Sequence, residues 1–232
     1  MSSKRVEPFE KYPERYESWF SRNKGTYLSE LDAVRAMLPK GEGVEIGVGT
    51  GRFAAPLGIG FGIDPSKEMI VLARERGVEV VRGVAEALPM KSSSLDIALM
   101  VTTVCFVDDL RSTMREAWRI LKPGGSLIVG FIDRNSQLGR QYMERSKESV
   151  FYKVAVFYSV DELTEHLMKA GFRGFRFVQT VFRPLPDAAT KEPVRKGHGS
   201  GSFVVIKTRK PDQNMPGAEA QVSDHGRSAT GK

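Results

Sequence analysis

Apolar positions change their spacing from one segment of the chain to the next, and this spacing predicts alternating strands and helices. Between residues 43 and 131, short runs rich in Val and Ile are bounded by Gly, Pro or Asp, which is typical of strands. These runs cover 44–47, 59–64, 78–82, 95–101 and 126–131. Two later runs, at 173–181 and 202–208, predict two further strands. Strands that alternate with helices indicate an α/β fold with a mostly parallel sheet and helices on both faces.

The helices between these strands have recognisable ends. The spacing predicts a helix over 67–76 that stops at Gly77, because a glycine readily takes the left-handed conformation after a helix. A second helix is predicted over 110–121. Ser159, with Glu162 three residues later, forms a capping box that begins a third helix, which runs to about residue 170.

The first forty residues carry helical spacing. Apolar residues from Tyr27 to Leu38 recur three and four positions apart, so they form one face of a helix. The earlier segment 9–20 places aromatic residues at mostly helical spacing. This segment is either an amphipathic helix packed by its rings or a lid over a pocket.

These patterns divide the chain into a helical lid segment at 1–40, an α/β domain at 41–209 and a tail at 210–232. The tail has almost no large apolar residue, so we expect it to be disordered. The polar segment 183–201 holds three prolines and predicts a long loop or a small insertion.

Composition excludes several classes of protein. The 232 residues carry a net charge of +7, spread without long runs of like charge, which favours a solvated surface over a nucleic-acid site. Cys105 is the only cysteine and there are three histidines, so we expect neither a disulfide nor a metal site. The sequence shows no apolar run long enough to span a membrane and no secretory signal. We therefore expect a cytoplasmic protein.

The most informative segment is 44–51, where a buried strand leads into glycines at every second position, Gly47, Gly49 and Gly51. Glycines there allow a tight turn and let the backbone approach a ligand that a Cβ would exclude. The segment lacks the spacing of the dinucleotide-binding motif and the Gly-Lys-Ser/Thr of a phosphate-binding loop. Glu45, on the strand, is suited to an ammonium group, so the segment favours a cofactor without a pyrophosphate that ends in an amino acid.

Two more strand ends strengthen this interpretation. Asp64 ends the second strand, where an acidic side chain can accept hydrogen bonds from both hydroxyls of a ribose, although it can equally cap the next helix. The segment 83–89 follows the third strand and is suited to an adenine ring. The end of the fourth strand, at Val101 and Thr102, is expected to line the same pocket.

With these motifs in order, the chain resembles the class I S-adenosylmethionine-dependent methyltransferases. The motifs are EIGVGTGR, GIDPS, GVAEALPM, LDIALMV and REAWRILKPGGSLIVG, and the resemblance covers roughly residues 12–171. It is strongest to the menaquinone-biosynthesis branch, the methyltransferase-11 family. The chain is also similar to small bacterial proteins labelled amine N-methyltransferases.

The resemblance implies a Rossmann-like seven-stranded sheet of order 3-2-1-4-5-7-6 with strand 7 antiparallel. It implies an enzyme that binds S-adenosylmethionine and leaves S-adenosylhomocysteine. The glycines would hold the methionine part, near Glu45, Asp64 would bind the ribose, and the aromatic N-terminal segment would cover the cofactor. The implied cofactor-binding residues are Tyr16, Trp19, Glu45, Gly47, Gly49, Gly51, Asp64, Pro65, Ala85, Glu86, Val101 and Thr102. Many relatives have an acidic residue where Val84 stands, so adenine recognition departs from the pattern of the family.

The methyl acceptor is expected to be a small molecule: an amine, a phenol or an activated carbon. A dedicated catalytic base is often unnecessary for this chemistry, so the sequence identifies no catalytic residue. Candidate acceptor residues follow strands four and five, or come later in the chain. They are Thr102, Thr103, Cys105, Phe106, Asp133, Arg134, Asn135, Tyr152, Phe157 and Tyr158.

Three alternatives stay open at this point. One is a methyltransferase for RNA or another nucleic acid, which the absence of a proline-containing tetrapeptide after strand four and of a Pro-Cys or Thr-Cys pair disfavours. Another is a cofactor-binding relative without catalysis. The third, an NAD-dependent oxidoreductase, is disfavoured by the glycine spacing. The sequence does not determine the oligomeric state.

Overall fold

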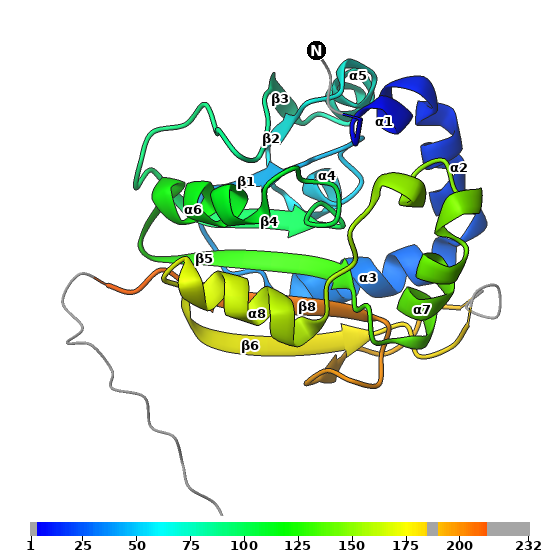
Figure 1. Cartoon of the computed structure of the whole chain (residues 1–232). Coiled ribbons are helices and arrows are strands. Elements are labelled where there is room, and N and C mark those ends of the chain that lie inside the picture. The colour runs from blue at the N-terminus through cyan, green and yellow to red at the C-terminus, as the bar shows by residue number, and fades with distance from the viewer. Residues whose placement is uncertain (1–3, 185–189, 213–232) are drawn as a thin grey trace, which may run out of the picture.

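A twisted sheet of eight strands forms the centre of the computed structural model, which describes residues 4–184 and 190–212 (Figure 1). The strand order is β3-β2-β1-β4-β5-β8-β6-β7. Neighbours from β3 to β5 are parallel, whereas β8 is antiparallel to both β5 and β6. The strands are β1 Gly43–Ile46, β2 Phe61–Asp64, β3 Glu79–Arg82, β4 Leu95–Val101, β5 Leu121–Ile132, β6 Arg173–Thr180, β7 Arg195–Lys196 and β8 Phe203–Arg209.

The predicted sheet order is confirmed, with β8 in the place of the seventh strand. The difference is one additional strand, β7, which lies at the sheet edge and pairs with Val178 and Gln179 of β6. Its two residues, Arg195 and Lys196, are polar and exposed. A strand this short leaves no apolar run, which is why the sequence pattern predicted a loop or insertion there.

Helices cover both faces of the sheet (Figure 1). None of the helices among the described residues has both the length and the apolar character that crossing a membrane requires. The helices are α1 Glu7–Lys11, α2 Pro13–Arg22, α3 Lys24–Met37, α4 Ala54–Leu57, α5 Lys67–Glu75, α6 Leu110–Ile120, α7 Gln137–Glu144 and α8 Val160–Lys169, with 3-10 helices at Ser146–Glu148 and Tyr152–Val154.

Two apolar cores lie on opposite faces of the sheet. On one face α6 and α8 pack against Ala98 and Met100 of β4, and on the other α3 and α5 pack against Ile97 and Leu99. Because side chains alternate along a strand, a strand buried on both faces needs apolar residues at nearly every position. This requirement explains the unbroken apolar run from Ile97 to Val101 in β4.

Two elements differ from the predicted boundaries for identifiable reasons. The aromatic segment 9–20 forms two helices, because Pro13 lacks a backbone N–H and disfavours helical geometry at Tyr12. Strand β5 begins at Leu121, before the turn-like residues 123–125. Leu121 pairs with Leu95, and the ladder then shifts register, so these residues lie in an irregular stretch of the strand.

Two parts of the chain have structure that the sequence pattern did not predict: the segment after β5, and Lys210 beyond β8. Helix α7 and the two 3-10 helices follow β5, where apolar spacing is weak. The tail predicted at 210–232 lies outside the described residues apart from 210–212. Lys210 is buried, and its ammonium donates hydrogen bonds to the carbonyls of Trp118 and Leu121.

Replacing the cap of α8 is expected to cost stability. The capping box predicted at Ser159 and Glu162 is present. Ser159→Ala should lower the free energy of unfolding by about 1 kcal/mol, because a backbone N–H of the first turn loses its acceptor. Thr164→Val, on the same helix, removes a buried hydroxyl that has no partner among the described residues and should change stability by less than about 0.5 kcal/mol. Urea denaturation of both variants measures the difference, and equal losses would contradict this role of Ser159.

Candidate active site

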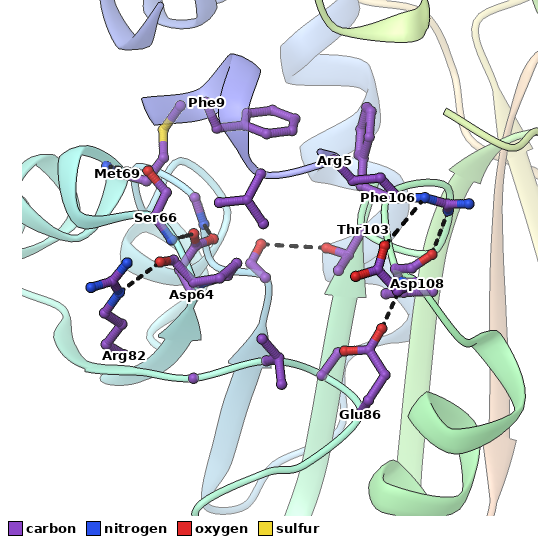
Figure 2. Close-up of a pocket in the computed structure, with 18 of the residues that line it drawn as sticks. Arg5, Phe9, Asp64, Ser66, Met69, Arg82, Glu86, Thr103, Phe106 and Asp108 are labelled. Carbon is purple, nitrogen blue, oxygen red and sulfur yellow. Dashed lines mark hydrogen bonds and ion pairs between the residues drawn. The ribbon is translucent and has the colours of Figure 1, made fainter. Parts of the chain in front are cut away.

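A cavity of about 600 Å³ lies at the carboxyl ends of β1, β2 and β4 (Figure 2). This volume is within the range of small-molecule sites, roughly 300–1,000 Å³. The position follows from the topology, because ligands of open α/β sheets bind beyond the carboxyl ends of parallel strands. The glycine-containing loop after β1 and the N-terminal residues Arg5, Phe9 and Tyr16 lie on different sides of the cavity.

The loop after β1 has a conformation that glycine allows. Gly47, Gly49 and Gly51 have φ angles of +71°, +54° and +78°. Gly47 and Gly49 line the cavity, and a Cβ added at Gly49 would lie 3.4 Å from the Tyr16 hydroxyl. Gly51 lies away from the cavity, against Ala73 of α5. Gly47 and Gly49 therefore give a ligand access to the backbone. Gly51 allows α5 to pack closely against the loop.

Asp64 connects this loop to the tip of β2. Its Oδ2 accepts a hydrogen bond from the N–H of Gly49 at 2.8 Å, and its Oδ1 accepts one from the N–H of Ser66 at 2.9 Å. Figure 2 shows the carboxyl at the edge of the cavity. Burial raises the pKa of Asp64 to about 6, although the two N–H groups act to lower it. Each oxygen accepts one bond here, which leaves lone pairs for hydroxyl groups of a ligand.

Glu45 takes a position that differs from the one expected. It is buried and is not among the residues that line the cavity. Its carboxyl accepts a hydrogen bond from the N–H of Ala54, and its Oε2 is buried without a partner in the described part of the chain. Burial raises the pKa of Glu45 well above its ordinary value.

Glu17 of α2 fastens the N-terminal helices to the site. Its carboxylate accepts hydrogen bonds from the side chains of Thr50 and Arg52 in the glycine loop and of Arg76 at the end of α5. Burial acts to raise the pKa of Glu17, but these donors leave the pKa below its ordinary value. One carboxylate thereby joins three segments that are far apart in sequence.

The N-terminal segment makes a second attachment at α5. The Oε1 atom of Glu10 accepts a hydrogen bond at 3.0 Å from the backbone N–H of Lys67, in the first turn of α5. Phe9 packs edge-on against Phe106, with ring centroids 4.9 Å apart. Trp19, by contrast, lies outside the cavity and shares a side-chain hydrogen bond with Tyr142.

The other end of the cavity lies along β4 and the segment after β3. Glu86 lines the cavity, and its Oε1 also accepts hydrogen bonds from the N–H groups of Asp108 and Asp109. Thr102, at the tip of β4, has a φ of +52°, which is rare for a β-branched residue. Backbone strain of this kind clusters at functional sites.

Most residues predicted to bind the cofactor therefore lie together around one cavity. The exceptions are Trp19, Glu45 and Gly51. Those that line it are Tyr16, Gly47, Gly49, Asp64, Pro65, Ala85, Glu86, Val101 and Thr102.

Several lining residues were not predicted from the sequence. Phe9 belongs to the aromatic segment at 9–20, which was its only signal. Arg5 and Met69 carried no signal, because they reach the cavity from elements whose docking depends on tertiary contacts. Within the described residues, no three His, Cys, Asp or Glu side chains gather in the manner of a metal site.

Comparison with known proteins agrees with this geometry. A family model described as "Methyltransferase domain" matches residues 44–129. A crystal structure from Thermotoga maritima is 52% identical, with a TM-score of 0.87 over 89% of this chain and 99% of that one. It is described as an "SAM-dependent methyltransferase, possible histamine N-methyltransferase". The chain belongs to the S-adenosylmethionine-dependent methyltransferases.

Two other relatives of this methyltransferase are similar over more than half of its chain. An uncharacterized protein of Methanocaldococcus jannaschii is 44% identical over 87% of this chain and 98% of its own length. A demethylmenaquinone methyltransferase of Chlorobaculum tepidum is 32% identical over 64% of this chain and 65% of its own length. The chain is thus an enzyme, its cofactor is S-adenosylmethionine, and the predicted methyltransferase-11 family is confirmed.

The residues around the cavity suit this cofactor, which carries positive charges on its sulfur and its amino group. Burial raises the pKa of the Tyr16 hydroxyl, and the charges of Glu45, Asp64, Glu17 and Glu30 raise it further. Of these carboxyl groups, Glu17 and Asp64 are ionised at neutral pH, so they make the potential near Tyr16 and Gly49 negative. A negative potential stabilises a cationic ligand at this end of the cavity.

Gly47 offers a test of the loop geometry. A Cβ at Gly47 would lie 2.3 Å from Cγ2 of Thr103, whereas one at Gly58, with a similar φ of +74°, would meet nothing within 4 Å. Gly58→Ala should therefore cost only backbone strain, about 1–2 kcal/mol. Gly47→Ala should cost about 1–3 kcal/mol more, because of the overlap with Thr103. Chemical denaturation measures both losses. The double variant Gly47→Ala/Thr103→Ala should recover part of the excess, and no recovery would contradict the clash.

Proposed function

We propose that this methyltransferase transfers a methyl group to a small-molecule acceptor, with amines as the first class to test. The observation that carries the proposal is the cavity, which the N-terminal helices enclose on one side with the rings of Phe9 and Tyr16. The similarity to the Thermotoga maritima protein, whose description names histamine, supports an amine. Phenols and activated carbons, as in menaquinone biosynthesis, are the next classes.

Each end of the cavity has residues suited to one part of the cofactor. Asp64 would accept hydrogen bonds from the ribose hydroxyls, and the backbone of Gly47 and Gly49 would contact the methionine part. Pro65, Ala85, Glu86, Val101 and Thr102 would enclose the adenine. A bound cofactor would favour the ionised form of Glu45, which would then stabilise the ammonium group of the methionine part. When bound, S-adenosylmethionine supplies a methyl group that is already activated by the positive sulfur.

The remaining tasks of the protein are orientation and exclusion of water. Residues 1–40 would act as a lid, because Glu17 and Glu10 attach α1 and α2 to the glycine loop and to α5. Phe9 and Phe106, which contact each other at the cavity wall, would exclude water from the reacting atoms.

A nucleic-acid acceptor has less support. Burial raises the pKa of Cys105 to about 12, so this residue is a neutral thiol at physiological pH. A neutral thiol is a poor nucleophile, which argues against methylation of cytosine C5 through a cysteine adduct.

An acceptor screen tests the proposed activity. The full chain, incubated with S-adenosylmethionine and a panel of amines beginning with histamine, then phenols and quinols, should form S-adenosylhomocysteine and one methylated product, both measured by mass spectrometry. The product identifies the class of acceptor. Turnover of transfer RNA or DNA in parallel reactions, without turnover of any small molecule, would overturn the proposal.

Asp64 provides a pH-dependent test of the cofactor site. Because its pKa is about 6, the carboxyl is ionised above this pH and protonated below it. Affinity for S-adenosylhomocysteine should therefore fall as the pH is lowered from about 7.5 to about 5, by at most about tenfold per pH unit. Isothermal titration calorimetry measures the trend.

Variants separate this effect from general acid sensitivity. Asp64→Asn should weaken binding by about 1–3 kcal/mol at neutral pH and remove the trend below pH 6, because the charge is absent throughout. Asp96→Asn is the control, since Asp96 is partly exposed and pairs with Lys122 outside the cavity. Equal affinities of the wild type and Asp64→Asn would exclude Asp64 from the site.

A further inference from the structure

A pair of buried polar side chains on α3 lies outside the cofactor cavity. Glu30 is 3% exposed, and within the described residues its carboxyl has no hydrogen-bond or ion-pair partner. One turn earlier, the hydroxyl of Thr26 is buried and, in the same part of the chain, also lacks a partner. Residues four apart share one helix face, so the two groups are neighbours. Burial alone raises the pKa of Glu30 to about 8.

Aromatic side chains surround this pair. Tyr142 of α7 stacks on Tyr152, with ring centroids 4.4 Å apart, and shares side-chain hydrogen bonds with Tyr152 and Trp19. Burial raises the pKa of both tyrosines, and the charge of Glu30 contributes to both shifts. The carboxyl therefore lies within electrostatic range of both phenol groups. Figure 1 shows that α2, α3 and α7, which carry these residues, gather at one end of the molecule.

This cluster borders the cofactor cavity. Phe106 lines the cavity and lies parallel to Tyr152, with an interplanar angle of 11° and centroids 6.5 Å apart. Tyr16 also lines the cavity, and the charge of Glu30 contributes to the raised pKa of its hydroxyl. Phe106 thus contacts both the cavity and the cluster, and an acceptor held in the cluster would lie next to the cofactor cavity.

Unpaired buried polar groups are costly for a fold and are rare without a function. We propose that Thr26, Glu30, Tyr142 and Tyr152 form the acceptor subsite of this methyltransferase and that the subsite binds the protonated nitrogen of an amine. This inference rests on the proposed small-molecule acceptor and names its chemical class. A cation would pair with Glu30, accept stabilisation from the tyrosine faces and satisfy the hydroxyl of Thr26. An anionic acceptor would find no cationic partner here, because none of these four side chains carries a positive charge.

The cover of the cluster is able to open. No residue from 141 to 156 is fully buried, and the two 3-10 helices in this stretch have no buried side chain. Segments with so few buried contacts open at low free-energy cost. An amine would enter when this segment moves away from α3.

Binding experiments with matched ligands test the subsite. The full chain is saturated with S-adenosylhomocysteine and titrated with phenethylamine, 2-phenylethanol, histamine and the alcohol analogue of histamine. Within each pair the ring and chain are the same, and only the ammonium is replaced by a hydroxyl. At least one amine should bind about tenfold or more tightly than its alcohol. Alcohols that bind as tightly as amines, or the failure of both amines to bind, would overturn the inference.

Single substitutions test whether Glu30 and Thr26 cause the preference for amines. Glu30→Gln should weaken amine binding at least about tenfold, leave the binding of alcohols within about twofold, and not lower the melting temperature. Thr26→Val should also weaken amine binding. Thr180→Val is the matched control, because its hydroxyl is also buried and without a partner in the described part of the chain, but lies on β6. If Glu30→Gln fails to fold, the amine affinities of Thr26→Val and Thr180→Val are compared. Weaker binding by Thr26→Val alone supports the subsite, and equal affinities would overturn it.

Binding of S-adenosylhomocysteine distinguishes this inference from the proposed function. If the wild type does not bind S-adenosylhomocysteine, the proposed position of the cofactor is wrong. If every variant binds it normally and Glu30→Gln also keeps its affinity for amines, only the acceptor subsite is wrong.

Discussion

The carboxylate of Asp64 is the interaction on which the site depends. It accepts hydrogen bonds from Gly49, in the loop after β1, and from Ser66, at the start of α5. Two segments that follow neighbouring strands are thereby held in one geometry. The parallel pairing of β1 and β2 makes this contact available, because it brings the carboxyl ends of both strands to the same edge. The cavity, its glycine wall and the ribose site we propose all follow from this arrangement.

Carboxylates also attach the N-terminal helices to the site. Glu17 and Glu10 of the N-terminal helices accept hydrogen bonds from the glycine loop and from the first turn of α5. Such bonds to ionised groups are stronger than neutral ones, so two carboxylates are enough to hold short helices over the cavity. Glu45 and Glu30 are buried with few or no donors, which raises the pKa of both, and a bound cation would favour their ionised forms.

The sequence predicted positions correctly where a residue type at a fixed spacing has a single structural role. The glycine loop, Asp64 and the capping box at Ser159 each combine a residue type with a fixed spacing, and each occupies the place predicted for it. Predictions from the sequence were less accurate where a residue type can either line a site or pack within the fold. Gly51 makes room for Ala73 and does not line the cavity, and Trp19 binds Tyr142 and lies outside it.

The sequence by itself determined the alternation of strands and helices and the capping box, because apolar spacing and capping are local properties. Its motifs also resemble the family, and that resemblance implied the order of the sheet and nine of the residues around the cavity. Only the tertiary structure decided that Glu45 does not line the cavity and that Arg5 and Phe9 do. It also decided that Glu30 lies unpaired beside Tyr142 and Tyr152. Contacts between segments more than a hundred residues apart depend on packing, and packing leaves no spacing in the sequence.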